Sequence, residues 1–343
     1  MYKNATVGLV VPAYNEEGKV GTVIDTVPAY VDRIYVVDDG STDGTWAEIT
    51  AHADEGNRKT TPEADRFDER FVPIRHEENR GVGGAIKTGY LRAREERIDV
   101  TAVVGGDGQM HPDELGRYLD PIVDGTAEYA KGSRFSSPED MVGIPPFRLV
   151  GNLTLSYLTK YASGYWFLMD SQNGYAAISL HALEEIDLEG MYEYYGYCND
   201  LLVKLNLEDL RVADVPRSAE FAYSEGWDSH IDYAEYVPRV SWMLLRNFVG
   251  RLYRKHLLRE RDPFVLCYGA GVGLVLKSIR DRVGSGDERS TPWLSTVGGV
   301  LLFLLGTLLD ARANRDLCVR VDRDSARGDD AVQRRPTDRQ RND

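Results

Sequence analysis

Three apolar runs in the first third of the chain each end in a cluster of acidic or glycine residues, and this pattern constrains the fold more than any other feature. The runs are residues 6–12, 33–37 and 100–104, and β-branched residues are frequent in each of them. Short runs of this kind predict buried strands. The intervening segments with a helical pattern are 16–27, 45–53 and 84–96. Strands that alternate with helices predict an α/β domain with a Rossmann-like, mostly parallel sheet flanked by helices.

The rest of the N-terminal two thirds is less regular. Further strands are expected at 71–75, 175–179 and 211–215, and a helix turn at 199–206. The charged stretch 54–69 has few apolar residues and is expected to form a surface loop. The stretch 136–147 is rich in Ser, Pro and Gly, which predicts a mobile loop.

Four motifs lie at or near the ends of the predicted strands. They are Val10–Glu17, Val36–Thr45, Asn79–Ala85 and Gly106–Pro112. In an open parallel sheet the strand ends form the crevice in which ligands bind. Carboxylates that gather there can hold a ribose and a divalent cation on a diphosphate. Together the motifs predict a nucleotide-sugar site.

Asp107 is the strongest single candidate for chemistry. It follows Gly105 and Gly106, so the backbone can approach a ligand closely at the strand end. Its carboxylate can bind Mg²⁺ or Mn²⁺, and such an ion neutralises charge on a leaving diphosphate. Gln109 and His111 lie in the same loop and could serve as second ligands. An isolated Asp-Gly pair would more simply be a turn, but the other three motifs favour the site.

Asp38 and Asp39 follow another predicted strand. Asp-Gly after a strand is a common turn, and Asp39 could merely cap the next helix. The functional interpretation gives one of the two carboxylates to the base and ribose edge of the nucleotide. Two adjacent acids at the carboxyl edge of a sheet favour that interpretation.

The glycine-rich segment around Gly83 excludes two familiar phosphate-binding motifs. Ile86 interrupts the dinucleotide pattern that Gly81 and Gly83 begin. The same Ile86 stands where a phosphate loop ending in Lys87 needs glycine. The glycines are therefore expected to let this helix pack against the sheet near the nucleotide.

Three further charged residues each have two interpretations. Arg134 and Arg148 suit bidentate binding of phosphate, but either could form an ordinary surface salt bridge. Asp200 stands at the start of a predicted helix, where it could be a carboxylate on the acceptor side or simply an N-cap.

Composition limits the partners and the compartment. The 343 residues carry a net charge of −14, which argues against nucleic acid as the main partner because phosphate binding needs a basic face. Only nine of the 41 basic residues are Lys, and an acidic chain poor in Lys is typical of a halophilic source. The three Cys are far apart, so neither a disulfide framework nor a zinc site is expected, and a reduced, cytosol-facing compartment fits.

The composition changes after Tyr236. Residues 237–258 combine Trp, Phe and Leu with five basic residues. This combination predicts an amphipathic helix, spanning 233–262, that lies in a membrane interface. The alternative is a helix that packs on the rest of the domain.

Two apolar stretches follow. Residues 263–279 and 291–309 approach the length of a membrane span and predict a transmembrane helical hairpin within 263–317. The alternative is a pair of buried helices in a soluble protein. Residues 318–343 are charged with few apolar residues, which predicts a disordered tail.

On these residues, the chain resembles glycosyltransferase family 2, whose fold is of the GT-A type. Segments 11–17, 37–45 and 79–85 follow the order and spacing of the family's signatures. The resemblance is nearest to the branch that contains dolichyl-phosphate mannose and glucose synthases, and to haloarchaeal enzymes of S-layer N-glycosylation. The segments that carry this second likeness are 199–202, 212–216, 223–231 and 309–317.

The resemblance also implies roles for single residues. Family members often carry Asp where Gly105 stands, so metal binding would depend on Asp107 together with Gln109. The residues implied to contact the nucleotide are Pro12, Tyr14, Glu16 and Asp39. Those implied to contact phosphates are Arg134 and Arg148, and those in an acceptor loop are Tyr223, Glu225 and Ser229.

The implied activity is an inverting transfer of a hexose from UDP-glucose, UDP-N-acetylglucosamine or GDP-mannose to dolichyl phosphate, the first step of protein N-glycosylation. Two alternatives stay open. One is transfer to a hydroxyl of a lipid-linked glycan, for which Asp200 would be the general base. The other is a non-catalytic membrane scaffold. The expected organisation is a cytoplasmic catalytic domain over 1–232 on a multi-pass cell-membrane anchor, and the oligomeric state is left open.

Overall fold

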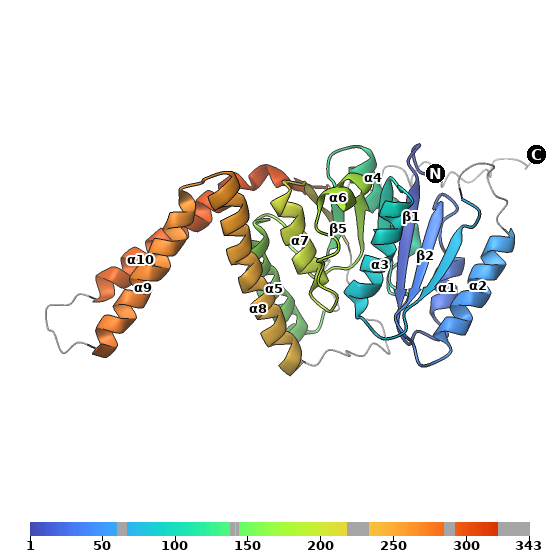
Figure 1. The fold of residues 1–343 in the computed structure, drawn as a ribbon, viewed down its shortest axis with the longest axis horizontal. Helices are drawn as coiled ribbons and strands as arrows, with labels where there is room; N and C mark the ends of the chain where they lie inside the picture. Colours follow the sequence, from blue (N-terminus) through green and yellow to red (C-terminus); the bar gives the residue numbers. More distant parts are fainter. Residues whose placement is uncertain (60–66, 138–140, 142–143, 218–232, 285–291, 322–343) are drawn as a thin grey trace, which may run out of the picture.

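The computed structural model describes residues 1–59, 67–137, 141, 144–217, 233–284 and 292–321. Within these residues the centre is an eight-stranded sheet with the order β3-β2-β1-β4-β6-β5-β7-β8 (Figure 1). Strand β6 runs antiparallel to β4 and β5, and the other neighbouring strands are parallel, which confirms the mostly parallel sheet. The strands are β1 (Val7–Ala13), β2 (Arg33–Asp38), β3 (Phe71–Arg75), β4 (Val100–Val103), β5 (Tyr129–Ser133), β6 (Ala176–Ser179), β7 (Val212–Pro216) and β8 (Cys318–Arg320).

Helices flank the sheet on both faces because successive residues of a strand point to opposite sides. In β1, Leu9 and Val11 join the core under α1, α2 and α4, whereas Val10 joins the core under α3. Gly89 of α3 lets that helix lie directly on Val10, since a Cβ at Gly89 would be 2.4 Å from Val10 Cγ1. The helices around the sheet are α1 (Val20–Asp25), α2 (Thr45–Lys59), α3 (Val82–Glu95), α4 (Gly116–Val123), α6 (Leu180–Glu185) and α7 (Tyr197–Leu207).

A second group of helices packs beside α7. Helix α5 (Pro146–Ser163) and helix α8 (Tyr233–Arg251) contact each other and α7 (Figure 1). Val240, Met243 and Leu244 of α8 are buried in this packing, so the helix predicted to be interfacial also packs on the domain. Its other face exposes apolar side chains such as Trp242. A π-helical segment, Leu252–Arg259, continues α8.

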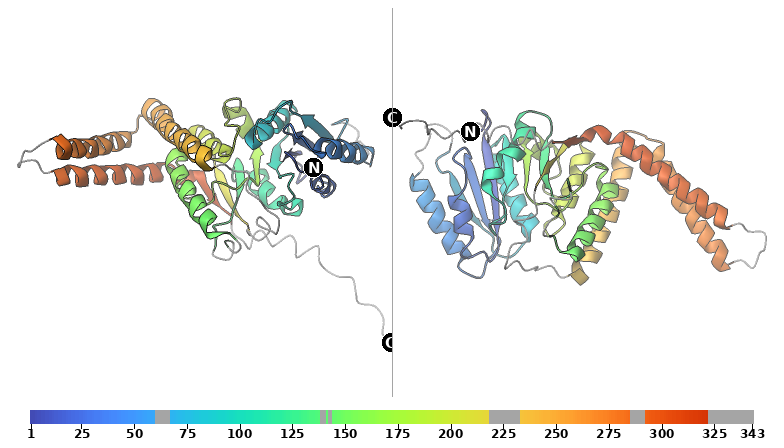
Figure 2. Two further views of the ribbon diagram at one scale, coloured as in Figure 1. Left: turned by 90° about the horizontal axis from the view of Figure 1, so that it is seen from below. Right: turned by 180° about the vertical axis from the view of Figure 1, so that it is seen from behind.

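The last two helices form an antiparallel pair that projects from the body (Figures 1 and 2). They are α9 (Phe264–Gly284) and α10 (Pro292–Ala313). Their backbones approach closely at glycine, since a Cβ on Gly271 would lie 2.8 Å from the Gly299 carbonyl oxygen. Of the described residues, only α10 forms a helix long and apolar enough to cross a membrane. The first predicted span, 263–279, falls in α9, whose second half carries Lys277 and several further charges.

Three expectations about segments need correction. Helix α2 continues to Lys59, so the loop expected from residue 54 begins too early. The Asn57 side chain bonds Phe71 and Arg70 of the neighbouring strand region, which holds this charged turn in place. Helix α5 begins at Pro146, inside the stretch expected to be a mobile loop, and Phe135 and Ile144 are buried together before it.

The predicted disordered tail also begins too early. Cys318–Arg320 form β8, which pairs in parallel with β7 through Val212 and Cys318. The edge of β7 offers unpaired backbone groups that a short segment can complete, whatever its composition. The sheet of the predicted catalytic domain therefore includes a strand that follows the hairpin, and residues 322–343 lie outside the described part.

Candidate active site at the carboxyl edge of the sheet

Three loops meet at the end of β1. The Asp39 N–H donates to the Ala13 carbonyl at 2.9 Å, and the Gly106 N–H donates to the Pro12 carbonyl at 3.0 Å. A Cβ on Gly106 would lie 3.0 Å from that same Pro12 oxygen, so glycine permits the close approach. β1 lies between β2 and β4, where the strand order reverses direction, and this is the position at which open α/β sheets bind ligands.

The loop after β1 is fixed by the loop after β2. The Asn15 N–H donates to Ser41 Oγ at 3.0 Å, and the Glu16 N–H donates to Thr45 Oγ1 at 2.8 Å. Asn15 has a φ of 55°, a left-handed conformation that Asn tolerates. Tyr14 is left exposed at this edge. The hydroxyl groups of Ser41 and Thr45, after β2, therefore fix the conformation of the loop after β1.

Asp38 and Asp39 are both buried at the end of β2. Asp38 accepts the Ser41 N–H at 3.1 Å and lies 3.1 Å from Arg75 Nε. Asp39 Oδ1 accepts the Arg80 N–H at 2.9 Å and lies 2.7 Å from His76 Nδ1. Helix α2 begins at Thr45, so Asp39 does not cap it.

His76 extends this network and was missed by sequence reasoning. Its Nε2 lies 2.9 Å from Thr88 Oγ1 of α3, so the ring joins Asp39 to that helix. The signal that could have found it is its position, because His76 is the first residue after β3 and polar residues at strand ends mark this edge.

The Asp107 loop follows β4. Asp107 Oδ1 accepts the Gln109 N–H at 3.0 Å, and a Cβ on Gly105 would lie 2.9 Å from that oxygen. A side chain at position 105 would thus face the Asp107 carboxylate. Buried Arg217, just after β7, donates to the Gln109 carbonyl at 2.7 Å and lies over the Tyr175 ring. Sequence reasoning missed Arg217, whose role depends on this contact between distant segments.

Lys19 and Tyr195 lie within electrostatic reach of the Asp107 and Glu16 carboxylates. The pKa of Lys19 is raised, first by its hydrogen bond to Glu16 and then, against the effect of burial, by the negative charges of Glu16 and Asp107. Burial raises the pKa of Tyr195, and the charges of Asp107 and Glu16 add to it. Carboxylate oxygens are the ligands that Mg²⁺ and Mn²⁺ prefer, so Asp107 with Glu16 nearby suits a divalent cation.

Gly83 lies against a loop between α6 and α7. A Cβ there would be 2.6 Å from the Tyr192 carbonyl oxygen, and the next residue, Gly84, donates its N–H to the Glu193 carbonyl at 2.8 Å. The glycines therefore position the segment that carries the exposed Tyr194 and Tyr195 beside the site. The expected packing of α3 on the sheet is made by Gly89.

Arg134 is bonded to a buried carboxylate, Asp170. Its Nε and Nη2 donate to the two carboxylate oxygens of Asp170 at 2.6 and 3.0 Å, and its backbone N–H donates to the same group. Burial acts to raise the pKa of Asp170, but the charges of Arg134 and Lys131 outweigh it, and the pKa is lowered. Lys131 is itself buried and donates to the Asp170 carbonyl and to Asp214. The guanidinium predicted to bind phosphate is thus paired with a carboxylate.

The remaining predicted residues are spread over three places. Arg148 lies in the first turn of α5. Buried Asp200 accepts the Tyr192 N–H at 3.0 Å and the Asn247 Nδ2 group at 2.8 Å, so it joins a loop beside the site to α8. Gly196 is the N-cap of α7, so the interpretation of Asp200 as that cap is wrong. The acceptor-loop residues Tyr223, Glu225 and Ser229 lie outside the described residues.

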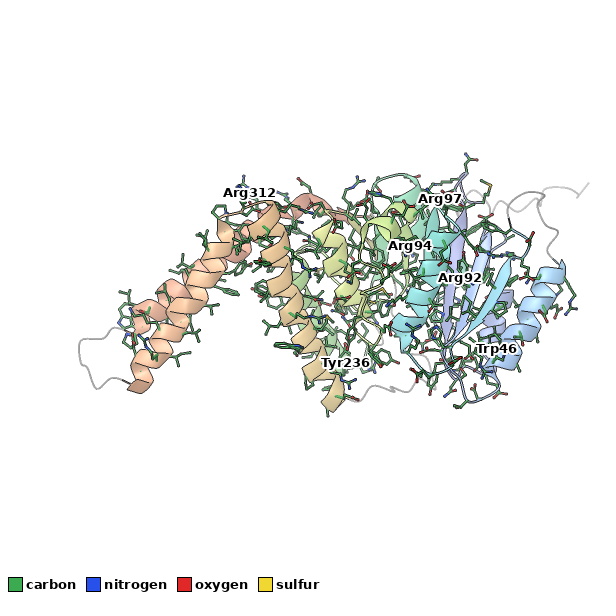
Figure 3. The ribbon with its side chains drawn as sticks, viewed as in Figure 1. Trp46, Arg92, Arg94, Arg97, Tyr236 and Arg312 are labelled. Atoms are coloured by element: carbon green, nitrogen blue, oxygen red, sulfur yellow. The ribbon has the colours of Figure 1, made fainter. Side chains whose placement is uncertain are left out.

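Figure 3 sets this edge of the sheet against the opposite one. Trp46 of α2 and Tyr236 of α8 lie on the side where the strands end, whereas Arg97 lies on the other side (Figure 3). The Arg75 guanidinium stacks over Trp46 at 5.5 Å, and the Tyr236 hydroxyl donates to Gln172 at 3.3 Å. The candidate site extends along this edge toward α8.

Comparison with known proteins agrees with this geometry. The family model described as glycosyl transferase family 2 matches residues 9–187. The chain is 33% identical over 209 residues to the UDP-N-acetylglucosamine–dolichyl-phosphate N-acetylglucosaminyltransferase of Methanococcus voltae, covering 61% of this chain and 83% of that protein. It is 31% identical over 193 residues to the polyprenol monophosphomannose synthase of Mycolicibacterium smegmatis, covering 55% and 67%.

Among solved structures, glucosyl-3-phosphoglycerate synthase of Mycobacterium tuberculosis superposes with a TM-score of 0.49 at 17% identity, covering 72% of this chain and 78% of that one. The family model covers more than half of the chain, and the relatives at over 30% identity are named as glycosyltransferases or a sugar-lipid synthase. The chain is a glycosyltransferase and belongs to glycosyl transferase family 2.

Proposed function

We propose that the protein transfers a hexose from a nucleotide sugar to dolichyl phosphate, with inversion, as the first step of protein N-glycosylation. The observation that carries the proposal is the gathering of Glu16, Asp39 and Asp107 around the end of β1, where the backbones of three loops are bonded together. One relative is named for transfer to dolichyl phosphate and another for synthesis of polyprenol monophosphomannose, which supports this acceptor class.

The donor would lie across the end of β1. Asp39 would face the base and ribose, held by His76, while Asp38 would hold the same loop through Ser41. Asp107 would hold Mg²⁺ or Mn²⁺ together with diphosphate oxygens and water. When bound, such an ion neutralises the charge that builds on the leaving diphosphate. Arg217 would keep the Asp107 loop in place through the Gln109 carbonyl.

Transfer to a phosphate acceptor does not require the protein to remove a proton from the acceptor. It is ionised at neutral pH and can attack the anomeric carbon directly, so the protein contributes alignment and charge stabilisation. The contacts of Asp200 favour this acceptor over a hydroxyl. Both of its oxygens accept hydrogen bonds from the protein, from Tyr192 and from Asn247, which suits a structural tie better than a general base.

Replacement of Asp200 by Asn tests the hydroxyl alternative. We expect transfer to fall by less than about tenfold, because a residue that only joins two segments loses a hydrogen bond, whereas loss of a general base costs about 10²–10⁴-fold. The measurement is kcat with dolichyl phosphate at saturating donor. Asn247→Leu removes the same tie without touching a carboxylate, so a far larger loss in Asp200→Asn than in Asn247→Leu would favour the hydroxyl acceptor.

We propose further that the protein acts at a membrane. The outward faces of α5 and α8 carry exposed Phe147, Val150, Tyr157, Trp242 and Leu245 on adjacent helices. Exposed apolar patches rimmed by polar residues mark sites of membrane or protein contact. The hairpin points away from the body and back toward the side on which the strands end (Figure 1).

The chain on either side of the hairpin supports a two-pass anchor. The π-helical segment before α9 contacts α7 through Arg259, whose Nη1 donates to the Leu207 carbonyl, and β8 after α10 pairs with β7. Both ends thus belong to one body on one side of the bilayer. If α10 crosses the membrane, the connected α9 crosses with it. The less apolar α9 would then pack closely against α10 at Gly271 and Gly299, which reduces its contact with lipid. We place the body on the cytoplasmic side.

Incubation of membranes that contain the protein with labelled donors tests the proposed function. UDP-N-acetylglucosamine, UDP-glucose and GDP-mannose would be supplied separately with dolichyl phosphate, and the lipid extracted. We expect one donor to label a lipid that mild acid releases, as a polyprenyl sugar phosphate would, and no label in membranes with Asp107→Asn. Label in an acid-stable glycolipid, or nucleotide binding without turnover of any donor, would contradict the proposal.

A further inference from the structure

We propose that a buried polar cluster at the base of the hairpin, centred on Arg251 and Asp310, positions the membrane anchor relative to the active site and so determines whether a long lipid phosphate reaches it. Arg251 ends α8, and Asp310 lies near the end of α10. The inference rests on the proposed function, since it concerns the acceptor of that site.

The centre of the cluster is an ion pair that is fully buried on both sides. Arg251 Nη2 and Nη1 donate to the two oxygens of Asp310 at 2.7 and 2.9 Å, and both side chains are 0% exposed. Arg251 also donates from Nε to the Ala162 carbonyl and from Nη2 to the Tyr161 carbonyl, both at 3.0 Å. One guanidinium thus joins the ends of α5, α8 and α10 through four bonds to carboxylate or carbonyl oxygens.

A second cation, one turn further on, joins α7 to the residue just after α10. Buried Lys255 donates to the Asn206 carbonyl of α7 at 2.8 Å and to Asn314 Oδ1 at 3.1 Å. Asn206 donates to the same Asn314 oxygen at 2.8 Å, and Asn314 donates to Asp310 Oδ1 at 2.8 Å. The chain that leaves the hairpin is therefore bonded to α7 and to the π-helical segment at once.

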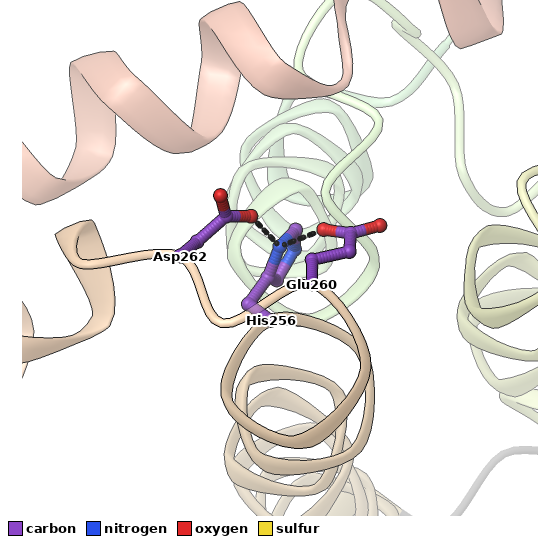
Figure 4. Close-up of side chains that lie close together, drawn as sticks. All are labelled: His256, Glu260 and Asp262. Carbon is purple, nitrogen blue, oxygen red and sulfur yellow. Dashed lines mark hydrogen bonds and ion pairs between the residues drawn. The ribbon is translucent and has the colours of Figure 1, made fainter.

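His256 also belongs to the cluster, and its ring faces Glu260 and Asp262 (Figure 4). Its Nδ1 lies 2.7 Å from Glu260 and 3.0 Å from Asp262, close enough for the three side chains to hold a metal ion. Its Nε2, however, lies 3.0 Å from Arg251 Nη1, and a guanidinium can only donate. The ring proton is therefore on Nδ1, where it is donated to the two carboxylates. His256 acts here as a hydrogen-bonded link between Arg251 and the turn before α9.

Physical chemistry suggests positioning as the role of this cluster. Two charges taken out of water are costly, and apolar residues of similar size would often serve stability as well or better. Directional hydrogen bonds do fix one orientation of the hairpin base, because each donor can reach only one set of acceptors. The hairpin base lies near the amino ends of the strands, whereas the candidate site lies at their carboxyl ends (Figure 1). A small change of angle at the base would thus move the far end of the hairpin relative to the site.

The experiment compares two acceptors. The full chain would be reconstituted in phosphatidylglycerol vesicles with long-chain dolichyl phosphate, and assayed separately in detergent with farnesyl phosphate, which is short enough to reach the site without the anchor. In the variant with Arg251→Met and Asp310→Leu together, no buried charge is left unpaired, so the chain is expected to fold. We expect kcat/KM for dolichyl phosphate to fall about tenfold or more, because small misplacements are that costly, with kcat/KM for farnesyl phosphate and the KM for donor within about twofold.

Asp316→Asn is the matched control, because it removes an exposed acid just beyond α10 and should change neither acceptor. A parallel fall with both acceptors would overturn the proposal in favour of a purely structural role, and unchanged transfer to dolichyl phosphate would overturn it outright. If the unaltered protein transfers sugar to neither acceptor, the proposed function fails first, and the positioning role fails with it.

Discussion

Replacement of Asp107 by Asn is expected to lower kcat for sugar transfer about 10²–10³-fold or more, the loss that follows removal of one group aimed at developing charge. Asn keeps the size of the side chain and can still accept the Gln109 N–H through its carbonyl oxygen. It lacks the negative charge that would hold a divalent cation on the diphosphate. The measurement is the rate of labelled lipid formation at saturating donor and dolichyl phosphate.

Asp113→Asn provides the control for Asp107, since Asp113 is an exposed acid a few residues further along the same segment. It should retain nearly full activity. A titration of Mg²⁺ or Mn²⁺ adds a second readout, because the Asp107 variant should need far more metal for any remaining turnover. Undiminished kcat and an unchanged metal requirement in Asp107→Asn would remove the basis for the proposed site.

Replacement of Asp170 by Ala is expected to lower the free energy of unfolding by about 3–5 kcal/mol, the usual cost of leaving a buried charge without its partner. Asp170 is 0% exposed and accepts three hydrogen bonds from Arg134 alone. Its loss would remove the carboxylate that holds the Arg134 guanidinium, whose side chain is 11% exposed, and would weaken the surroundings of Lys131, which bonds the carbonyl of the same residue. Denaturant unfolding of the purified protein in detergent, followed by tryptophan fluorescence, measures this change.

Asp187→Ala is the comparison for Asp170. Asp187 also forms an ion pair, 2.9 Å from Lys204, but its carboxylate is 67% exposed. Exposed pairs contribute about 0–1 kcal/mol, so the change should be small. Equal effects from the two replacements would mean that Arg134 finds water or another acceptor once Asp170 is gone.

The position of the candidate site could be predicted because it follows from backbone geometry. Parallel strands bring their carboxyl ends to one edge, so Asp39 and Asp107 had to lie near one another once their strands were recognised. The same rule would have included His76, which follows β3 in the same way. No local rule indicates Asp170 or Arg217, because each acts through partners that are distant in the sequence.

Strand β5, helix α4 and strand β8 were not predicted from the sequence, and each of these omissions has a specific cause. Strand β5 contains Lys131, a residue type that is expected to be exposed; its burial is explained only by the ion pair with Asp214. Helix α4 contains Pro121, which normally signals a break. Strand β8 has three residues and depends on the edge of β7 for its existence. In each case tertiary contacts override what the local sequence favours.

The place of β8 in the sheet determines when the edge of β7 can be completed. Synthesis from the N-terminus delivers β1 to β7 first, but the strand that completes their edge emerges only after both helices of the hairpin have been made. Until then β7 presents an open edge of the kind that invites pairing with other chains. A chain shortened before the hairpin would therefore also lose β8 and leave the edge of β7 unpaired.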